Sequence, residues 1–148
     1  MKHAPPGYEC PFCSIAESLH APDAESAIVF ANAEVFALIP LHYYGGIKGN
    51  CLVVPRRHYE NVLEVPDELG CHFFAATRRL ADAMRRAFGC EGISTRQHNG
   101  PAGDQDVWHY HQHVFPRYPG DGLHGGGKDA YATGERMRLA AKLRAELQ

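Results

Sequence analysis

The stretch Trp108-His109-Tyr110-His111-Gln112-His113-Val114-Phe115 places a histidine at every second position. Alternate side chains of a β-strand point to the same face, so we expect a strand over Val107–Phe115 with three imidazoles on one face. Packing three polar rings together is costly unless a charged ligand or a metal ion receives them. The stretch therefore predicts a site in which the histidines bind a metal ion, act as a nucleophile and its helpers around a phosphate, or divide these roles.

A second motif, Cys10-Pro11-Phe12-Cys13, has the two-residue gap that lets both thiolates bind one zinc ion, which then needs two more nitrogen or sulfur ligands. The same spacing occurs in thiol–disulfide oxidoreductases, where a strand precedes the motif and a helix begins at it. Only nine residues precede Cys10, and two prolines and a glycine among them leave no room for that strand. The motif favours zinc over a redox pair or unrelated thiols.

The composition excludes several functional classes. The chain has 148 residues, 45% hydrophobic and 22% charged, which is typical of one compact domain over residues 1–148. Its formal charge of −2 gives no basic excess for binding nucleic acid. No apolar run is long enough to cross a membrane or to act as a secretory signal, and five cysteines cannot all pair. We therefore expect a cytoplasmic protein with reduced thiols and no membrane partner.

Hydrophobic patterning predicts both strands and helices. The period of three to four residues over Asp67–Phe88 predicts a long helix that ends at Gly89, and Thr133 is expected to cap a last helix over 133–147. Gly120–Gly127 is expected to be a connecting loop. Short apolar runs between turn residues predict strands; with the histidine stretch, they are Ser26–Phe30, Glu34–Pro40, Asn50–Pro55, Ile93–His98 and Val107–Phe115.

Taken together, three blocks in this order make the chain resemble the histidine triad family of nucleotide hydrolases and transferases. The blocks are Cys10–Cys13, the segment Cys51-Leu52-Val53-Val54-Pro55-Arg56-Arg57-His58, and Asn99–Arg117, which contains the triad. The resemblance implies an α+β fold: an antiparallel sheet of about five strands, a long helix packed on it, a C-terminal helix, and a homodimer.

The resemblance also implies a role for each site residue. His111 would be the nucleophile that attacks the α-phosphorus of a nucleotide and forms a nucleotidyl-histidine, which water then cleaves. A hydrogen bond from its second ring nitrogen to a backbone carbonyl would aim the neutral ring. His113 would donate to a phosphate oxygen or to the leaving group. Asn99, Gln105 and the backbone near Val107 match positions that hold the phosphates and the sugar, together with His113.

In the zinc-containing branch of the family, the first histidine of the triad binds metal. Carried over by position, the ligands are Cys10, Cys13, His58 and His109, a closed set that makes the zinc structural. This zinc segment of the N-terminus would cover about residues 8–20.

The chain departs from the family pattern at two positions. Asn50 stands where many relatives have a histidine that supports the nucleophile. Pro40 stands where relatives often have an acidic residue that binds the ribose hydroxyls. The resemblance therefore leaves the nucleotide preference open.

The leading hypothesis is a zinc-containing hydrolase or nucleotidyl transferase that acts on a nucleotide phosphoramidate, dinucleotide polyphosphate or nucleotidyl ester. One alternative is a metal-dependent hydrolase or oxygenase that uses all three triad histidines as ligands. The other is a nucleotide-binding or partner-docking module with weak turnover.

Overall fold

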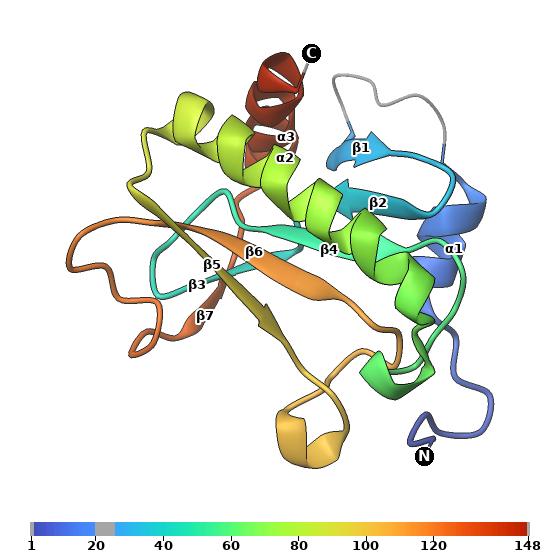
Figure 1. Cartoon of the computed structure of the whole chain (residues 1–148). Coiled ribbons are helices and arrows are strands. Elements are labelled where there is room, and N and C mark those ends of the chain that lie inside the picture. Colours follow the sequence, from blue (N-terminus) through green and yellow to red (C-terminus); the bar gives the residue numbers. More distant parts are fainter. Residues whose placement is uncertain (1, 20–25, 148) are drawn as a thin grey trace.

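A five-stranded antiparallel sheet forms the centre of the computed structural model, which describes residues 2–19 and 26–147 (Figure 1). The strand order is β1-β2-β4-β6-β5. The strands are β1 (Ile28–Ala31), β2 (Val35–Leu38), β4 (Cys51–Pro55), β5 (Gly92–Gln97) and β6 (Gln112–Arg117). The α+β class and the five predicted strands are thus confirmed, with shifted ends.

Alternation along the central strands sends side chains into two separate apolar layers. On β4, Cys51 and Val53 join the cluster beneath the long helix, whereas Leu52 and Val54 join a cluster on the opposite face with Phe12. Both faces of β2 and β4 are therefore covered, which explains why these strands read as continuous apolar runs.

The long helix α2 (Gly70–Phe88) crosses one face of the sheet (Figure 1). A 3₁₀ turn over Asp67–Leu69 precedes it, so the regular helix begins three residues later than the predicted start. Gly89 ends it with a φ of 66°, a conformation that suits glycine, and its amide donates to the Arg85 carbonyl. None of the described helices has the length and apolar character needed to span a membrane.

The C-terminal helix α3 (Glu135–Glu146) packs against α2 and β1. Thr133 is not its cap, which corrects the prediction. Gly134, with a φ of 79°, occupies the cap position, and no side chain caps the helix. The chain enters α3 through a left-handed glycine turn, which shifts the start by two residues from the predicted 133.

A small second sheet was not predicted. Strand β3 (His42–Tyr44) pairs with β7 (Lys128–Ala130), which follows the glycine-rich loop over 120–127. Gly45 and Gly122 meet so closely that a Cβ on Gly45 would lie 2.3 Å from the Gly122 carbonyl oxygen. The glycines thus allow the loop to fold back beside β3.

The N-terminal segment lies beside the sheet face that α2 leaves free. Its helix α1 (Pro11–Glu17) begins directly after Cys10, whose sulfur accepts the Cys13 amide at 3.4 Å. Of the predicted zinc segment 8–20, residue 20 lies outside the described residues. The remaining short helical turns are Val62–Glu64 and Pro101–Gly103.

Candidate functional site

The first half of the histidine stretch is not a strand, which corrects the prediction for Val107–Phe115. Pairing with β4 and β5 begins only at Gln112. Before it, the backbone bends: the His109 amide donates to Val107 at 2.9 Å, and the Tyr110 amide donates to Tyr59 at 2.6 Å. These local bonds replace the sheet ladder, so the three imidazoles do not line one strand face.

The bend divides the three histidines between two groups. His111 and His113 lie together, with ring centroids 5.2 Å apart. His109 instead meets His58, with ring centroids 4.8 Å apart, and its Nδ1 lies 3.2 Å from the Cys10 sulfur. Phe12 contacts both His109 and His111 edge-on and so stands between the groups. Of the interpretations left open by the spacing, the structure favours divided roles.

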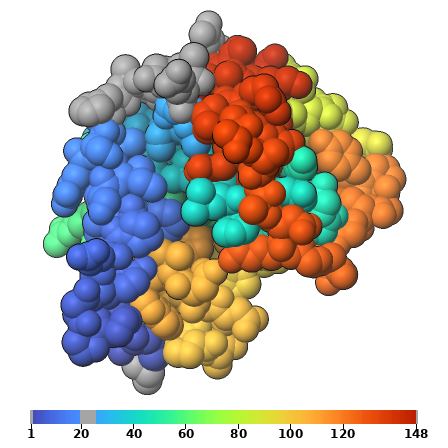
Figure 2. Space-filling view, turned by 180° about the vertical axis from the view of Figure 1, so that it is seen from behind, coloured from blue at the N-terminus to red at the C-terminus, as the bar shows by residue number. Residues whose placement is uncertain are grey.

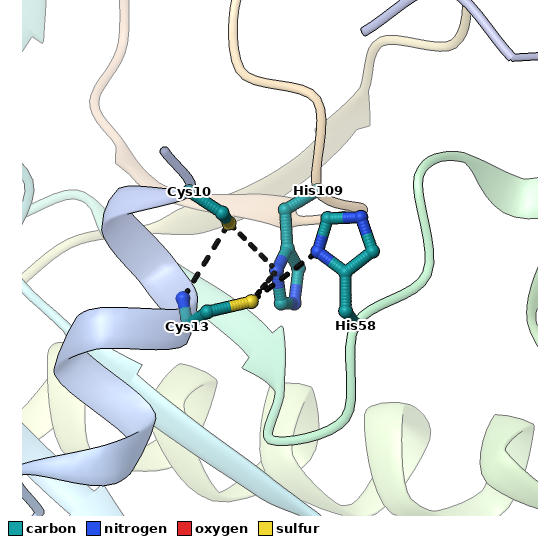
Figure 3. Close-up of side chains that lie close together, drawn as sticks. All are labelled: Cys10, Cys13, His58 and His109. Atoms are coloured by element: carbon teal, nitrogen blue, oxygen red, sulfur yellow. Dashed lines mark hydrogen bonds between the residues drawn. The ribbon is translucent and has the colours of Figure 1, made fainter. Parts of the chain in front are cut away.

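The predicted ligands Cys10, Cys13, His58 and His109 converge on one point, with all four candidate ligand atoms within 4.8 Å of one another (Figure 3). Cys13 Sγ lies 3.3 Å from His58 Nδ1 and 3.6 Å from His109 Nδ1. Ordinary zinc–ligand lengths in a tetrahedron place sulfur and nitrogen about 3.6 Å apart. The cluster therefore fits a tetrahedral zinc ion in both donor type and spacing.

Neighbouring groups set the tautomer and the protonation state of these side chains. His109 Nε2 lies 3.0 Å from the Pro55 carbonyl, which can only accept, so Nδ1 is the nitrogen left for a ligand. Burial lowers the pKa of His109 to about 4, which keeps the ring neutral, as a ligand must be. Burial and the Cys10 thiol raise the pKa of Cys13 to about 11, and a bound cation would reverse this by favouring the thiolate.

His111 is nine-tenths or more buried and is held by one hydrogen bond. Its Nδ1 lies 2.8 Å from the His109 carbonyl oxygen, the type of bond expected to aim the ring. Because the carbonyl can only accept, Nδ1 carries the proton and Nε2 keeps a free lone pair. Burial lowers the pKa of His111, which favours the neutral form. The ring thus has the protonation and orientation of a nitrogen nucleophile.

His113 belongs to β6 and has a different environment. Burial, together with the charges of His111, Arg96, His98 and Lys128, lowers its pKa to about 2. Its Nδ1 is buried and finds no hydrogen-bond partner within the described residues. An unsatisfied buried nitrogen of this kind is costly, and a bound ligand would relieve the cost.

A cavity of about 370 Å³ opens beside these two rings, which is the size range of small-molecule sites. Figure 2 shows this side of the molecule, with the blue N-terminal segment on one side and the cyan and orange-red β3–β7 region on the other. The apolar lining residues are Pro11, Phe12, Ile15, Leu38, Pro40, Leu41, Leu52 and Val107. The polar ones, besides His111 and His113, are His42, Tyr44, Asp106, Lys128 and Arg136.

The nucleotide-binding candidates do not all lie at this cavity. Val107 and His113 line it, but Asn99 and Gln105 do not. The Asn99 side chain accepts the Val62 amide at 2.7 Å. Gln105 is buried, accepts the Gly100 amide at 2.7 Å and donates to the Glu60 carbonyl at 2.5 Å. Both side chains hold the loop that precedes the histidines.

Sequence reasoning missed His98 and Arg96. Arg96 pairs directly with His113 across β5 and β6, and the His98 ring lies 5.8 Å from the His113 ring. Strand alternation could have found them, because Arg96 and His98 share a face that Asn99 does not. The cavity residues on β3, β7 and α3 carried no such signal, since those contacts are long-range.

The two departures from the family pattern are both structurally accommodated. Asn50 is fully buried; its Nδ2 donates to the His42 carbonyl at 3.3 Å, and its Oδ1 accepts the Tyr131 hydroxyl at 2.7 Å. At Pro40, Arg136 donates to the carbonyl at 2.9 Å and brings its cation to the cavity wall. The cavity wall beside Pro40 therefore carries a cation, Arg136.

Comparison with known proteins agrees with this fold. The chain is 40% identical over 115 residues to Protein hit of Bacillus subtilis, covering 77% of this chain and 75% of that protein. A zinc-bound histidine triad family protein from Mycobacterium smegmatis superimposes with a TM-score of 0.76 and 27% identity, covering 93% of this chain and 92% of that one. A solved HIT family member from Bacillus subtilis has a TM-score of 0.65 and 32% identity, with 93% and 96% covered. Residues 21–120 match the HIT domain, and the chain belongs to the HIT family.

Proposed function

We propose that the protein is a nucleotide hydrolase or nucleotidyl transferase in which His111 forms a covalent nucleotidyl intermediate. The observation that carries this proposal is the 2.8 Å contact of His111 Nδ1 with the His109 carbonyl, which leaves Nε2 free beside the cavity. The substrate classes are nucleotide phosphoramidates, dinucleotide polyphosphates and nucleotidyl esters, which share an α-phosphate joined to a leaving group.

The reaction takes two displacements at phosphorus. In the first, the His111 Nε2 lone pair forms a bond to the α-phosphorus, and the bond to the leaving group breaks with its electron pair. In the second, a water oxygen attacks the same phosphorus, the P–N bond breaks, and the water proton passes to solvent. The Nδ1–H bond to the His109 carbonyl stabilises the positive charge that His111 gains while the P–N bond exists.

Other residues orient the nucleotide in this proposal. His113 donates a hydrogen bond to a phosphate oxygen or to the leaving group, and Val107 supplies a wall of the cavity. The apolar lining around Phe12 and Leu38 accommodates the base. Asn99 and Gln105 act indirectly, by fixing the loop over 99–107.

We assign zinc to Cys10, Cys13, His58 and His109. With four protein ligands a zinc ion here would have no open position, so it would stabilise the fold and take no part in the reaction. It would fasten α1 and the segment after β4 to the backbone that carries His111. Because both cysteines must stay reduced, the proposed compartment is the cytoplasm.

The homodimer remains a proposal with two structural supports. Strand β5 forms one edge of the sheet, and edge strands are available for association. Phe74 of α2, which lines a surface pocket together with Thr95 of β5, is 73% exposed, and Leu63 is 81% exposed. Exposed apolar side chains beside a free edge are typical of a subunit interface.

Turnover of a substrate panel tests the proposed function. Adenosine phosphoramidate, diadenosine polyphosphates and a nucleotidyl ester would be incubated with the wild type and with His111→Ala. We expect kcat/KM for at least one substrate to fall by at least about a thousandfold in His111→Ala, because loss of a nucleophile removes the covalent route. Tight nucleotide binding without turnover in the wild type would favour the binding-module alternative.

The alternative that uses all three triad histidines as metal ligands has no geometric support. Within residues 2–19 and 26–147, only the Cys10, Cys13, His58 and His109 cluster brings three or more potential ligands together. The Nδ1 atoms of His109 and His111 face a sulfur atom and a carbonyl oxygen, respectively.

A further inference from the structure

Among the residues that the structure describes, Arg96 has no anionic partner. Its guanidinium carbon lies 4.8 Å from the Tyr44 ring centroid and 4.9 Å from that of Phe115, so two aromatic rings hold it in place. Its buried Nε finds no hydrogen-bond partner, and no described carboxylate forms an ion pair with it. Because the rings already hold the guanidinium in place, it loses little further conformational freedom when it binds an anion.

The location of Arg96 connects it to the proposed reaction. It is the direct cross-strand partner of His113, and strand alternation puts the two side chains on the same sheet face. Tyr44, which stacks on the guanidinium, lines the cavity together with His113. Arg96 therefore stands next to His113, on the side of β6 away from β4, and is separated from the cavity lining by the side chains of His113 and Tyr44 that it contacts or pairs with.

The charges around His113 are predominantly positive. Arg96, His98 and Lys128 all act on His113 in the direction that disfavours its protonation. Asp106 is the one carboxylate among the described cavity-lining residues, and its oxygen lies 3.4 Å from Lys128 Nζ. The aromatic cage of Arg96 contains no acid, so its positive charge is available to a ligand.

Building on the proposed function, we propose that Arg96 binds a phosphate group beyond the α-phosphate and thereby selects substrates with an anionic leaving group. When His111 Nε2 bonds to the α-phosphorus, the P–O bond to the leaving phosphate breaks and its electron pair stays on the departing oxygen. Arg96 stabilises the negative charge that develops there. Dinucleotide polyphosphates and other nucleoside polyphosphates fit this arrangement, whereas a phosphoramidate leaves Arg96 without a partner.

Calorimetric titration of AMP and ADP tests this assignment without depending on turnover, because ADP differs only by the added phosphate. The full chain would be compared with Arg96→Met, Arg96→Lys and the control Arg79→Met. Arg79 is also stacked on an aromatic ring, 5.0 Å from the Phe30 centroid, but lies on the outer helix α2. We expect the wild type to bind ADP about tenfold or more tightly than AMP, and Arg96→Met to abolish most of that preference without weakening AMP.

Arg96→Lys should keep part of the preference, because it preserves the charge without the planar fork, and Arg79→Met should keep all of it. Wild-type protein that binds AMP as tightly as ADP would overturn the inference, even if Arg96→Met did not fold. An equal loss of both nucleotides in Arg96→Met would also overturn it. If AMP binds and a nucleotide substrate forms a covalent adduct on His111, but ADP binds no more tightly than AMP, the proposed function stands and only the role of Arg96 is wrong. If no nucleotide binds, both fail.

Discussion

The Cys10 sulfur has two roles, as a proposed zinc ligand and as the cap of α1, and two different substitutions of Cys10 separate them. The sulfur accepts the Cys13 amide at 3.4 Å and lies 3.2 Å from His109 Nδ1. Cys10→Ala removes both roles, whereas Cys10→Ser keeps a good helix cap and removes only the thiolate. We expect zinc to fall from about one ion per chain to near zero in both variants, because three ligands no longer close the tetrahedron.

The size of the effect follows from linkage. A zinc ion present at 1,000 times its dissociation constant stabilises the folded state by about 4 kcal/mol. For a chain of this length, that corresponds to a drop in Tm of roughly 8–16 °C in Cys10→Ser. Loss of the cap in Cys10→Ala adds about 1 kcal/mol.

The assays are metal analysis by mass spectrometry and thermal unfolding with and without a chelator. Cys71→Ala is the matched control, because Cys71 is exposed on α2 and lies outside the cluster. Chelator should lower the Tm of the wild type and of the control to the level of Cys10→Ser. The reasoning would be refuted if Cys10→Ser kept its zinc, or if chelator left the wild-type Tm unchanged.

Three other predictions concern stability and assembly. Asp121→Asn should lower Tm at pH 7, because hydrogen bonds from Arg117 depress the pKa of the Asp121 carboxyl in the folded state. Protonation removes this stabilisation, so the difference in Tm between the variant and the wild type should shrink as pH falls below about 4. A difference in Tm that stays constant down to pH 2 in thermal unfolding would contradict this. Leu80→Ala, at a fully buried position between α2 and the sheet, should lower the unfolding free energy in urea by about 2–5 kcal/mol, and a loss below 1 kcal/mol would show that the core closes over the gap. Phe74→Glu should shift a dimer to monomer in light scattering, whereas a wild type that is already monomeric would remove the dimer proposal.

Local patterning was sufficient for the main layers of the fold. The period of α2 and its end at Gly89 follow from residues close together in the chain, and so do the apolar runs of β2 and β4. The start of α3 shows the limit of local patterns. Thr133 has a side chain that can cap a helix, but the next residue, Gly134, adopts a left-handed conformation and takes the cap position instead.

The candidate site needed information that local patterns do not contain. The alternation of His109, His111 and His113 predicted one strand, but the Tyr110 amide bonds to Tyr59 instead of to a neighbouring strand. The zinc cluster was found because family position supplied His58, which lies 45 residues from Cys13. Lys128 and Arg136 reach the cavity only through long-range packing, so no local pattern marked them.

Intact-protein mass spectrometry of a rapidly quenched single turnover tests the role of His111 most directly. Wild-type protein mixed with a nucleotide polyphosphate or phosphoramidate should gain the mass of one nucleoside monophosphate, and this adduct should decay as free nucleotide appears. His111→Ala should show no adduct, whereas His72→Ala, on the helix across the sheet, should behave as the wild type. Equal adduct formation in His111→Ala, or product release by the wild type with no adduct at any time, would contradict the proposed mechanism.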